Sequence, residues 1–263
     1  MGNRIEDRLK ALQEKNEKAL ITYMTAGLPD MEGTKAIIKA QEEAGTDIVE
    51  LGIPFSDPIA DGSVIQAASY ESIQKGTNLR KVFAMVEELR KECQLPLVFM
   101  MYYNTVLHYG LKEFAEKCAQ CGVDGLIIPD LPFEEQGELQ NALDGVVNAP
   151  ILLQLVSPVS KDRIATILQN ARGFVYCVSS MGVTGQEADF HKNVKAYLEE
   201  VKAVSNIPVM MGFGIRSAVD VEPVKECIDG AIVGSHFITM MKENEYNQNV
   251  IKEYIREFKK NMN

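Results

Sequence analysis

The sequence predicts a single (β/α)8 barrel domain that occupies the whole chain, residues 1–263. The length is close to the roughly 250 residues of a complete barrel. Short apolar runs also recur along the chain, each followed by a polar or glycine-rich loop and then an amphipathic stretch. This alternation is typical of parallel strands joined by right-handed helical crossovers. An open, doubly wound sheet is the structural alternative.

The expected strands are eight apolar runs without polar alternation, as parallel strands buried on both faces require. They lie at 19–25, 47–53, 95–102, 125–129, 150–156, 173–178, 207–212 and 230–233. No linker, repeat or low-complexity segment divides them, which favours one domain over two.

Capping residues mark the expected helices between these runs. Asp30 is placed to cap a helix that Gly45 then ends. An opening helix with Ile5, Leu9 and Leu12 on one face is expected to cover the floor of the barrel as an extra element. Additional short helices are expected within the strand-to-helix loops, because two of these loops are unusually long for connections in a compact domain.

The composition excludes several classes of function. Lys and Arg number 27 against 37 Asp and Glu, so the formal net charge is −10 and no basic footprint for nucleic acid is visible. Five cysteines, an odd number without a secretory leader, indicate reduced thiols and a cytoplasmic protein. No run is suited to span a membrane, and the histidines lack a common ligand spacing, so neither a membrane nor a metal is expected.

Three glycine-rich segments predict a phosphate site. They follow the last three strands and contain Gly185, Gly214 and the pair Gly234-Ser235. Glycine lets backbone N–H groups approach an anion closely, and a helix that begins at Ser235 would direct its positive end to the same point. Each segment alone could be a tight turn, but together they occupy the order of a barrel phosphate cradle.

Glu50 is an unusual residue for its surroundings. It lies in the otherwise apolar run Asp-Ile-Val-Glu-Leu-Gly-Ile at 47–53. A buried carboxyl is costly, and burial raises its pKa toward neutrality, where it can both give and take protons. A structural glutamate bonded to the backbone is the alternative.

Other candidate residues are ambiguous from the sequence alone. Asp57 and Asp61 lie in the adjoining loop, where Asp-Pro and Asp-Gly also read as turn chemistry. Tyr176 could be a core residue or a hydroxyl donor in an active site.

Longer motifs give a resemblance to a known family. Residues 50–62 read Glu-Leu-Gly-Ile-Pro-Phe-Ser-Asp-Pro-Ile-Ala-Asp-Gly. With Met-Tyr-Tyr-Asn at 101–104, Pro-Asp-Leu-Pro at 129–132, Tyr176 and the glycine segments, the chain resembles the tryptophan synthase alpha subunit family. The match runs in order over essentially the whole chain, and residues 50–62 are its most specific part.

The resemblance implies a lyase of tryptophan biosynthesis that cleaves indole-3-glycerol phosphate to indole and glyceraldehyde 3-phosphate by a retro-aldol reaction. It implies Glu50 as the general acid/base and Asp61 as the partner of the indole N–H. Tyr176 is implied to position Glu50, and Tyr23 to contact the indole where many relatives have Phe. Thr184 is implied to bond Asp61 when the loop closes.

The resemblance also implies a partner. The phosphate would lie against the glycine segments and Ser235, while Asp57, Asp130, Leu131 and Pro132 would face a beta subunit in an αββα heterotetramer. That subunit carries pyridoxal phosphate, and this chain is expected to need no cofactor of its own. Two alternatives stay open: another phosphate-binding barrel, such as a sugar-phosphate isomerase, and an activator subunit that mainly switches its partner.

Overall fold

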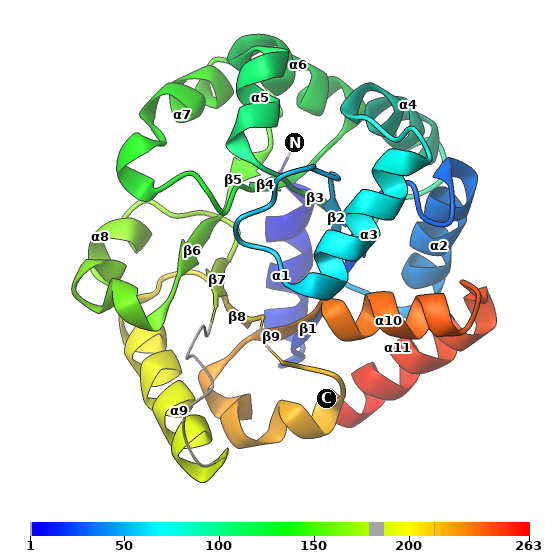
Figure 1. The fold of residues 1–263 in the computed structure, drawn as a ribbon. Helices are drawn as coiled ribbons and strands as arrows, with labels where there is room; N and C mark the ends of the chain where they lie inside the picture. The colour runs from blue at the N-terminus through cyan, green and yellow to red at the C-terminus, as the bar shows by residue number, and fades with distance from the viewer. Residues whose placement is uncertain (1, 179–186, 213) are drawn as a thin grey trace.

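The computed structural model describes residues 2–178, 187–212 and 214–263. Parallel strands form a ring, and helices surround it (Figure 1). The strands are β1 (Ala19–Thr25), β2 (Ile48–Gly52), β3 (Leu97–Met100), β4 (Gly125–Ile127), β5 (Ile151–Leu152), β6 (Gln154–Val156), β7 (Val175–Cys177), β8 (Val209–Met211) and β9 (Gly230–Val233). The barrel expected from the sequence is therefore confirmed.

The fifth expected strand is split in two. The sheet order runs β5-β4-β3-β2-β1-β9-β8-β7-β6, so β5 and β6 are the two ends of the ladder. These ends are joined by a single residue, Leu153. The first half pairs with β4 and the second half pairs with β7, so this one segment closes the ring.

Helices cover the outside of the barrel, often two for each connection. They are α1 (Arg4–Glu14), α2 (Met31–Ala44), α3 (Ser63–Gln74), α4 (Leu79–Leu89), α5 (Tyr103–Tyr109), α6 (Leu111–Cys121), α7 (Gly137–Asp144), α8 (Ile164–Leu168), α9 (Glu187–Val204), α10 (Ser235–Glu243) and α11 (Gln248–Met262), with 3-10 turns η1 (Phe133–Glu135), η2 (Pro158–Arg163), η3 (Ala218–Asp220) and η4 (Glu222–Cys227). The short helices expected in the strand-to-helix loops are present. Within the described ranges, every helix is too short or too polar to cross a membrane.

Local sequence explains where these helices begin and end. The Asp30 side chain accepts a hydrogen bond from the Gly33 N–H at 2.7 Å, and Gly45 ends α2 with a φ of 99°, in the left-handed region. Both caps were predicted.

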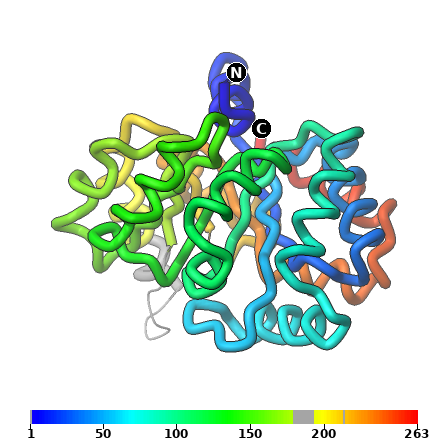
Figure 2. The backbone as a smooth tube through the Cα atoms, turned by 90° about the horizontal axis from the view of Figure 1, so that it is seen from above, coloured from blue at the N-terminus to red at the C-terminus, as the bar shows by residue number. Residues whose placement is uncertain are grey.

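Helix α1 closes the floor of the barrel, as expected. Ile5, Leu9 and Leu12 are buried in the cluster that fills the barrel interior. In Figure 2 α1 lies at one end of the molecule, and the segment from β2 to α3 lies at the opposite end. Arg8 forms an ion pair with the fully buried Asp47 at 2.6 Å, which ties α1 to the residue before β2.

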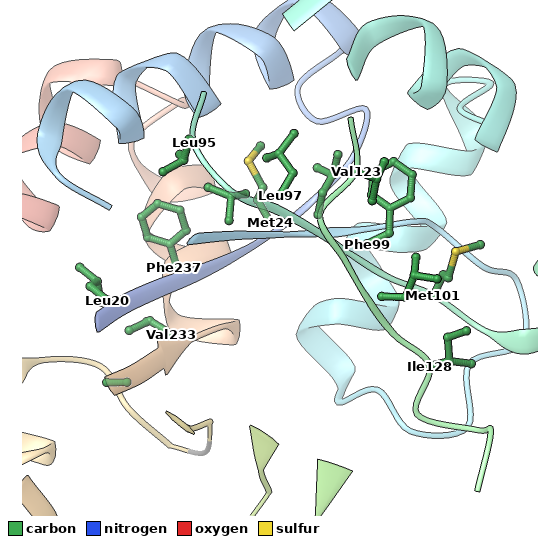
Figure 3. Close-up of a cluster of buried hydrophobic side chains, with 14 of the residues drawn as sticks. Leu20, Met24, Leu95, Leu97, Phe99, Met101, Val123, Ile128, Val233 and Phe237 are labelled. Carbon is green, nitrogen blue, oxygen red and sulfur yellow. The ribbon is translucent and has the colours of Figure 1, made fainter. Parts of the chain in front are cut away.

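Strand alternation sorts side chains between two cores. Leu20 and Met24 of β1 point outward, where Phe99 and Phe237 join them between the sheet and the helices (Figure 3). Ile21 and Tyr23 therefore take the inner face. The same alternation decides which residues of β2 can reach the interior.

Candidate active site

Glu50 points into the barrel. Its neighbour two residues earlier, Ile48, belongs to the interior cluster, and side chains two residues apart on a strand share a face. The residue is 0% exposed, and neither carboxyl oxygen has a hydrogen-bond partner. Burial raises the pKa of Glu50 from 4.5 to about 8. The side chain can therefore exchange protons near neutral pH.

Two tyrosines lie around this carboxyl. Tyr23 is the register partner of Glu50 on β1, and Tyr176 comes from β7. Both are buried, and burial followed by nearby charge, including that of Glu50, raises the pKa of each phenol. Both hydroxyls face glycines: a Cβ on Gly52 would lie 2.0 Å from the Tyr23 oxygen, and a Cβ on Gly212 would lie 2.5 Å from the Tyr176 oxygen.

Asp61 lies in the loop after β2, which crosses in front of the strands in Figure 1. The side chain is partly buried; burial raises its pKa, and a hydrogen bond with Tyr102 acts in the opposite direction. Tyr102 also accepts a hydrogen bond from the Ala60 N–H at 2.9 Å and stacks on Phe55 at a centroid distance of 5.0 Å. These contacts attach the loop to the end of β3.

Tyr102 is the residue of this site that sequence reasoning missed. It appeared only within the Met-Tyr-Tyr-Asn motif at 101–104, without a role. The available signal was a large side chain with a polar tip at the end of an apolar run. The structure leaves Tyr102 only 5% exposed.

The ends of β8 and β9 provide exposed backbone for an anion. Gly214 is exposed and has a φ of 66°, in the left-handed region. Gly234 precedes α10, which begins at Ser235 as predicted, and Ser235 is exposed. The free N–H groups and dipole at the start of this helix suit a phosphate. A Cβ on Gly234 would lie 3.9 Å from the Tyr23 Cβ, so this end borders the interior near Glu50.

Comparisons with known proteins decide the family. The sequence profile described as "Tryptophan synthase alpha chain" matches residues 9–263. The tryptophan synthase alpha chain of Lachnospira eligens is 60% identical over 262 residues, covering 99% of both chains, and that of Alkaliphilus metalliredigens is 48% identical over 239 residues, covering 90% of this chain and 89% of the relative. The chain belongs to the tryptophan synthase alpha chain family.

Solved structures agree. The crystal structure of tryptophan synthase subunit alpha from Legionella pneumophila superposes with a TM-score of 0.90 at 31% identity, covering 100% of this chain and 99% of that one. A tryptophan synthase structure from M. tuberculosis gives a TM-score of 0.87 at 32% identity, with 99% of each chain covered. The resemblance noted from the sequence is confirmed, and the chain is a lyase for the alpha reaction of tryptophan biosynthesis.

The barrel gathers most of the predicted site residues at one end. Glu50, Tyr23 and Tyr176 face the interior, and the Asp61 loop and the Gly234 turn follow strands that end there. Thr184 and Gly185 fall outside the described residues. In the part of the chain that the structure describes, no group of three His, Cys, Asp or Glu side chains could hold a metal ion.

The residues expected to face a partner differ in exposure. Asp57 and Pro132 are exposed, whereas Leu131 is 6% exposed and packs in the outer core. Asp130 accepts a hydrogen bond from the Tyr103 N–H at 2.9 Å, so it holds the start of α5. Within this segment Pro132 is exposed, Asp130 is partly exposed and Leu131 is buried.

Proposed function

We propose that this chain cleaves indole-3-glycerol phosphate at the carboxyl ends of its strands, with Glu50 as the general acid/base. The observation that carries the proposal is the buried, unpartnered Glu50 carboxyl with its raised pKa. Cleavage requires a proton at indole C3 and the loss of a proton from the adjacent side-chain hydroxyl. A carboxyl whose pKa lies near neutrality suits both transfers, which typically contribute about 10²–10⁴-fold to the rate.

Asp61 would accept the indole N–H and stabilise the positive charge that develops on the ring. Its loop is held by Tyr102 through the Ala60 N–H, which keeps the carboxylate near the end of β3. A fixed carboxylate in a partly buried site stabilises developing charge without reorganising during the reaction. Thr184 would add a second hydrogen bond to Asp61 from the sixth connection, and Tyr176 would orient Glu50.

The phosphate of the substrate would bind at the backbone of Gly185, Gly214, Gly234 and Ser235. The start of α10 supports this assignment, because the N-terminus of a helix favours an anion even in an acidic protein. Binding energy at the phosphate would then orient the reacting bond beside Glu50. The reaction needs no group beyond these side chains and amides, so we assign no cofactor to this chain.

The partner would be a tryptophan synthase beta subunit that carries pyridoxal phosphate, in an αββα heterotetramer. Exposed apolar side chains support a docking surface in loops and short helices after β2, β3 and β4: Ile59 is 83% exposed, Leu107 49% and Phe133 36%. Asp57 and Pro132 lie within the same loops. Docking there would place the partner over the proposed site, where it could receive indole.

The test is an assay of glyceraldehyde 3-phosphate formation from indole-3-glycerol phosphate, for the chain alone and with a beta subunit. Glu50→Gln should abolish turnover while substrate binding, measured by calorimetry, persists. Glu253→Gln, on the exposed face of α11, is the matched control and should turn over normally. Normal turnover by Glu50→Gln would refute the mechanism. Stimulation of the beta subunit's own reaction with no lyase turnover in either assay would favour the activator alternative.

A further inference from the structure

Tyr23 has a hydroxyl whose place in the barrel depends on a glycine. The residue is 5% exposed and pairs with Glu50 across the β1–β2 ladder. Because a Cβ on Gly52 would lie 2.0 Å from the hydroxyl oxygen, any other residue at 52 would occupy the position of that oxygen. The hydroxyl therefore lies beside Gly52, which is the next inward-facing position of β2 after Glu50.

The hydroxyl lies among the titratable groups of the site. Burial raises the pKa of Tyr23, and the charges of Asp61 and Glu50 raise it further, so the phenol keeps its proton at neutral pH. A hydrogen bond with the Thr25 side chain lowers the pKa of Tyr23. The other titratable groups near this pair, within the described chain, are the phenols of Tyr102 and Tyr176.

Glu50 needs a donor whenever it is ionised. Asp61 already has a hydrogen bond with the Tyr102 hydroxyl, whereas neither carboxyl oxygen of Glu50 has a hydrogen-bond partner. A buried carboxylate without a donor is costly, and a hydrogen bond to a charged acceptor is about twice as strong as a neutral one. A phenol that keeps its proton beside such a carboxyl can meet this need.

We propose that Tyr23 is a positioning residue for Glu50: seated over Gly52, its hydroxyl donates a hydrogen bond to the Glu50 carboxylate each time the carboxyl gives up its proton. The inference rests on the proposed role of Glu50. It adds a donor on β1 to the orienting role proposed above for Tyr176 on β7.

The experiment compares Tyr23→Phe with Tyr246→Phe. Tyr246 packs against the same small cluster as Tyr23, and its own hydroxyl is buried without a partner. Its electrostatic neighbours are Glu71 and Lys242 rather than Glu50. Each variant is labelled with ¹³C at the glutamate and aspartate carboxyls, and the titrations of Glu50 and Asp61 are followed by NMR. Lyase rates are measured across the same pH range.

Loss of the hydroxyl removes a donor that stabilises the ionised carboxyl, so it should raise the pKa of Glu50. We expect a shift of about one unit, which is about a tenfold change in the ionisation equilibrium. The limb of the kcat profile that follows Glu50 should move to higher pH by the same amount, and KM should stay within about twofold. Tyr246→Phe should leave both titrations in place. 3-Fluorotyrosine at position 23, a stronger donor of the same shape, should lower the pKa of Glu50.

An unmoved Glu50 titration in Tyr23→Phe would overturn the inference, and so would a shift of Asp61 alone. If Tyr23→Phe fails to fold, the fluorotyrosine protein decides: no downward shift overturns the inference as well. The proposed function is judged separately, by whether Glu50→Gln loses turnover.

Discussion

Burial of Glu50 should lower the free energy of unfolding at pH values where an exposed glutamate is ionised. Replacing Glu50 should recover this stability in a pH-dependent way. The folded pKa is about 8 against 4.5 for an exposed glutamate. The folded chain therefore holds the proton more tightly than the unfolded chain, and stability falls as the pH rises from 4.5 to 8. Since one pKa unit corresponds to about 1.4 kcal/mol, the cost reaches about 3 kcal/mol at pH 7 and about 5 kcal/mol above pH 8.

Glu50→Gln removes the ionisation and keeps the shape of the protonated carboxyl. The variant should match the original chain near pH 4.5 and exceed it by the amounts above at pH 7 and pH 9. The chain has no tryptophan, so unfolding in urea is best followed by far-UV circular dichroism. The stability difference at the three pH values is the measurement.

Glu43→Gln is the control for this series. Glu43 is exposed, and Lys252 donates a hydrogen bond to its carboxylate that lowers its pKa, so its replacement should give no gain in stability at any pH. A Glu50→Gln difference that stays constant between pH 4.5 and pH 9 would refute the idea that Glu50 is desolvated.

Three further changes test other parts of the site. Gly52→Ala should displace the Tyr23 ring and cost about 1–3 kcal/mol of stability in urea unfolding, and an unchanged midpoint would contradict the close packing. Gly234→Asp should raise KM for the phosphorylated substrate by at least about tenfold through charge repulsion, so an unaltered KM would argue against the cradle. Tyr102→Phe should raise the pKa of Asp61 and move the acidic limb of the kcat/KM profile to higher pH; a limb that does not move would separate Tyr102 from the charge of Asp61.

Much of the fold was predictable because buried parallel strands and helix caps leave local signals. The runs at 19–25 and 230–233 agree with β1 and β9, and Asp30 and Gly45 bound α2 as expected. The division of the run at 150–156 was not predictable. It depends on which neighbour each half of the segment pairs with when the ring closes, and this is a long-range property.

The residues of the site also differ in how far the sequence could predict them. An isolated carboxyl in an apolar strand is visible in the sequence, so Glu50 could be singled out before its burial was known. The roles of Tyr102 and Gly52 depend on contacts between segments far apart in the chain. Ala60 reaches Tyr102 across 42 positions, and the Tyr23 hydroxyl reaches Gly52 on the next strand, so no local pattern reveals either contact.

The split strand lies in a part of the barrel wall that combines short ladders with short covering helices. The β1–β2 ladder has five residue pairs, whereas β6–β7 has three, and β4–β5 has two, as does β8–β9. The cover outside this part of the wall is also thin, since α7 has eight residues and α8 has five. Backbone amides at 151–156 should therefore exchange with deuterated water sooner than those of β1 and β2. Local opening of the barrel would begin at β5 and β6. The strands β1 and β2, which carry Tyr23 and Glu50, would open more slowly.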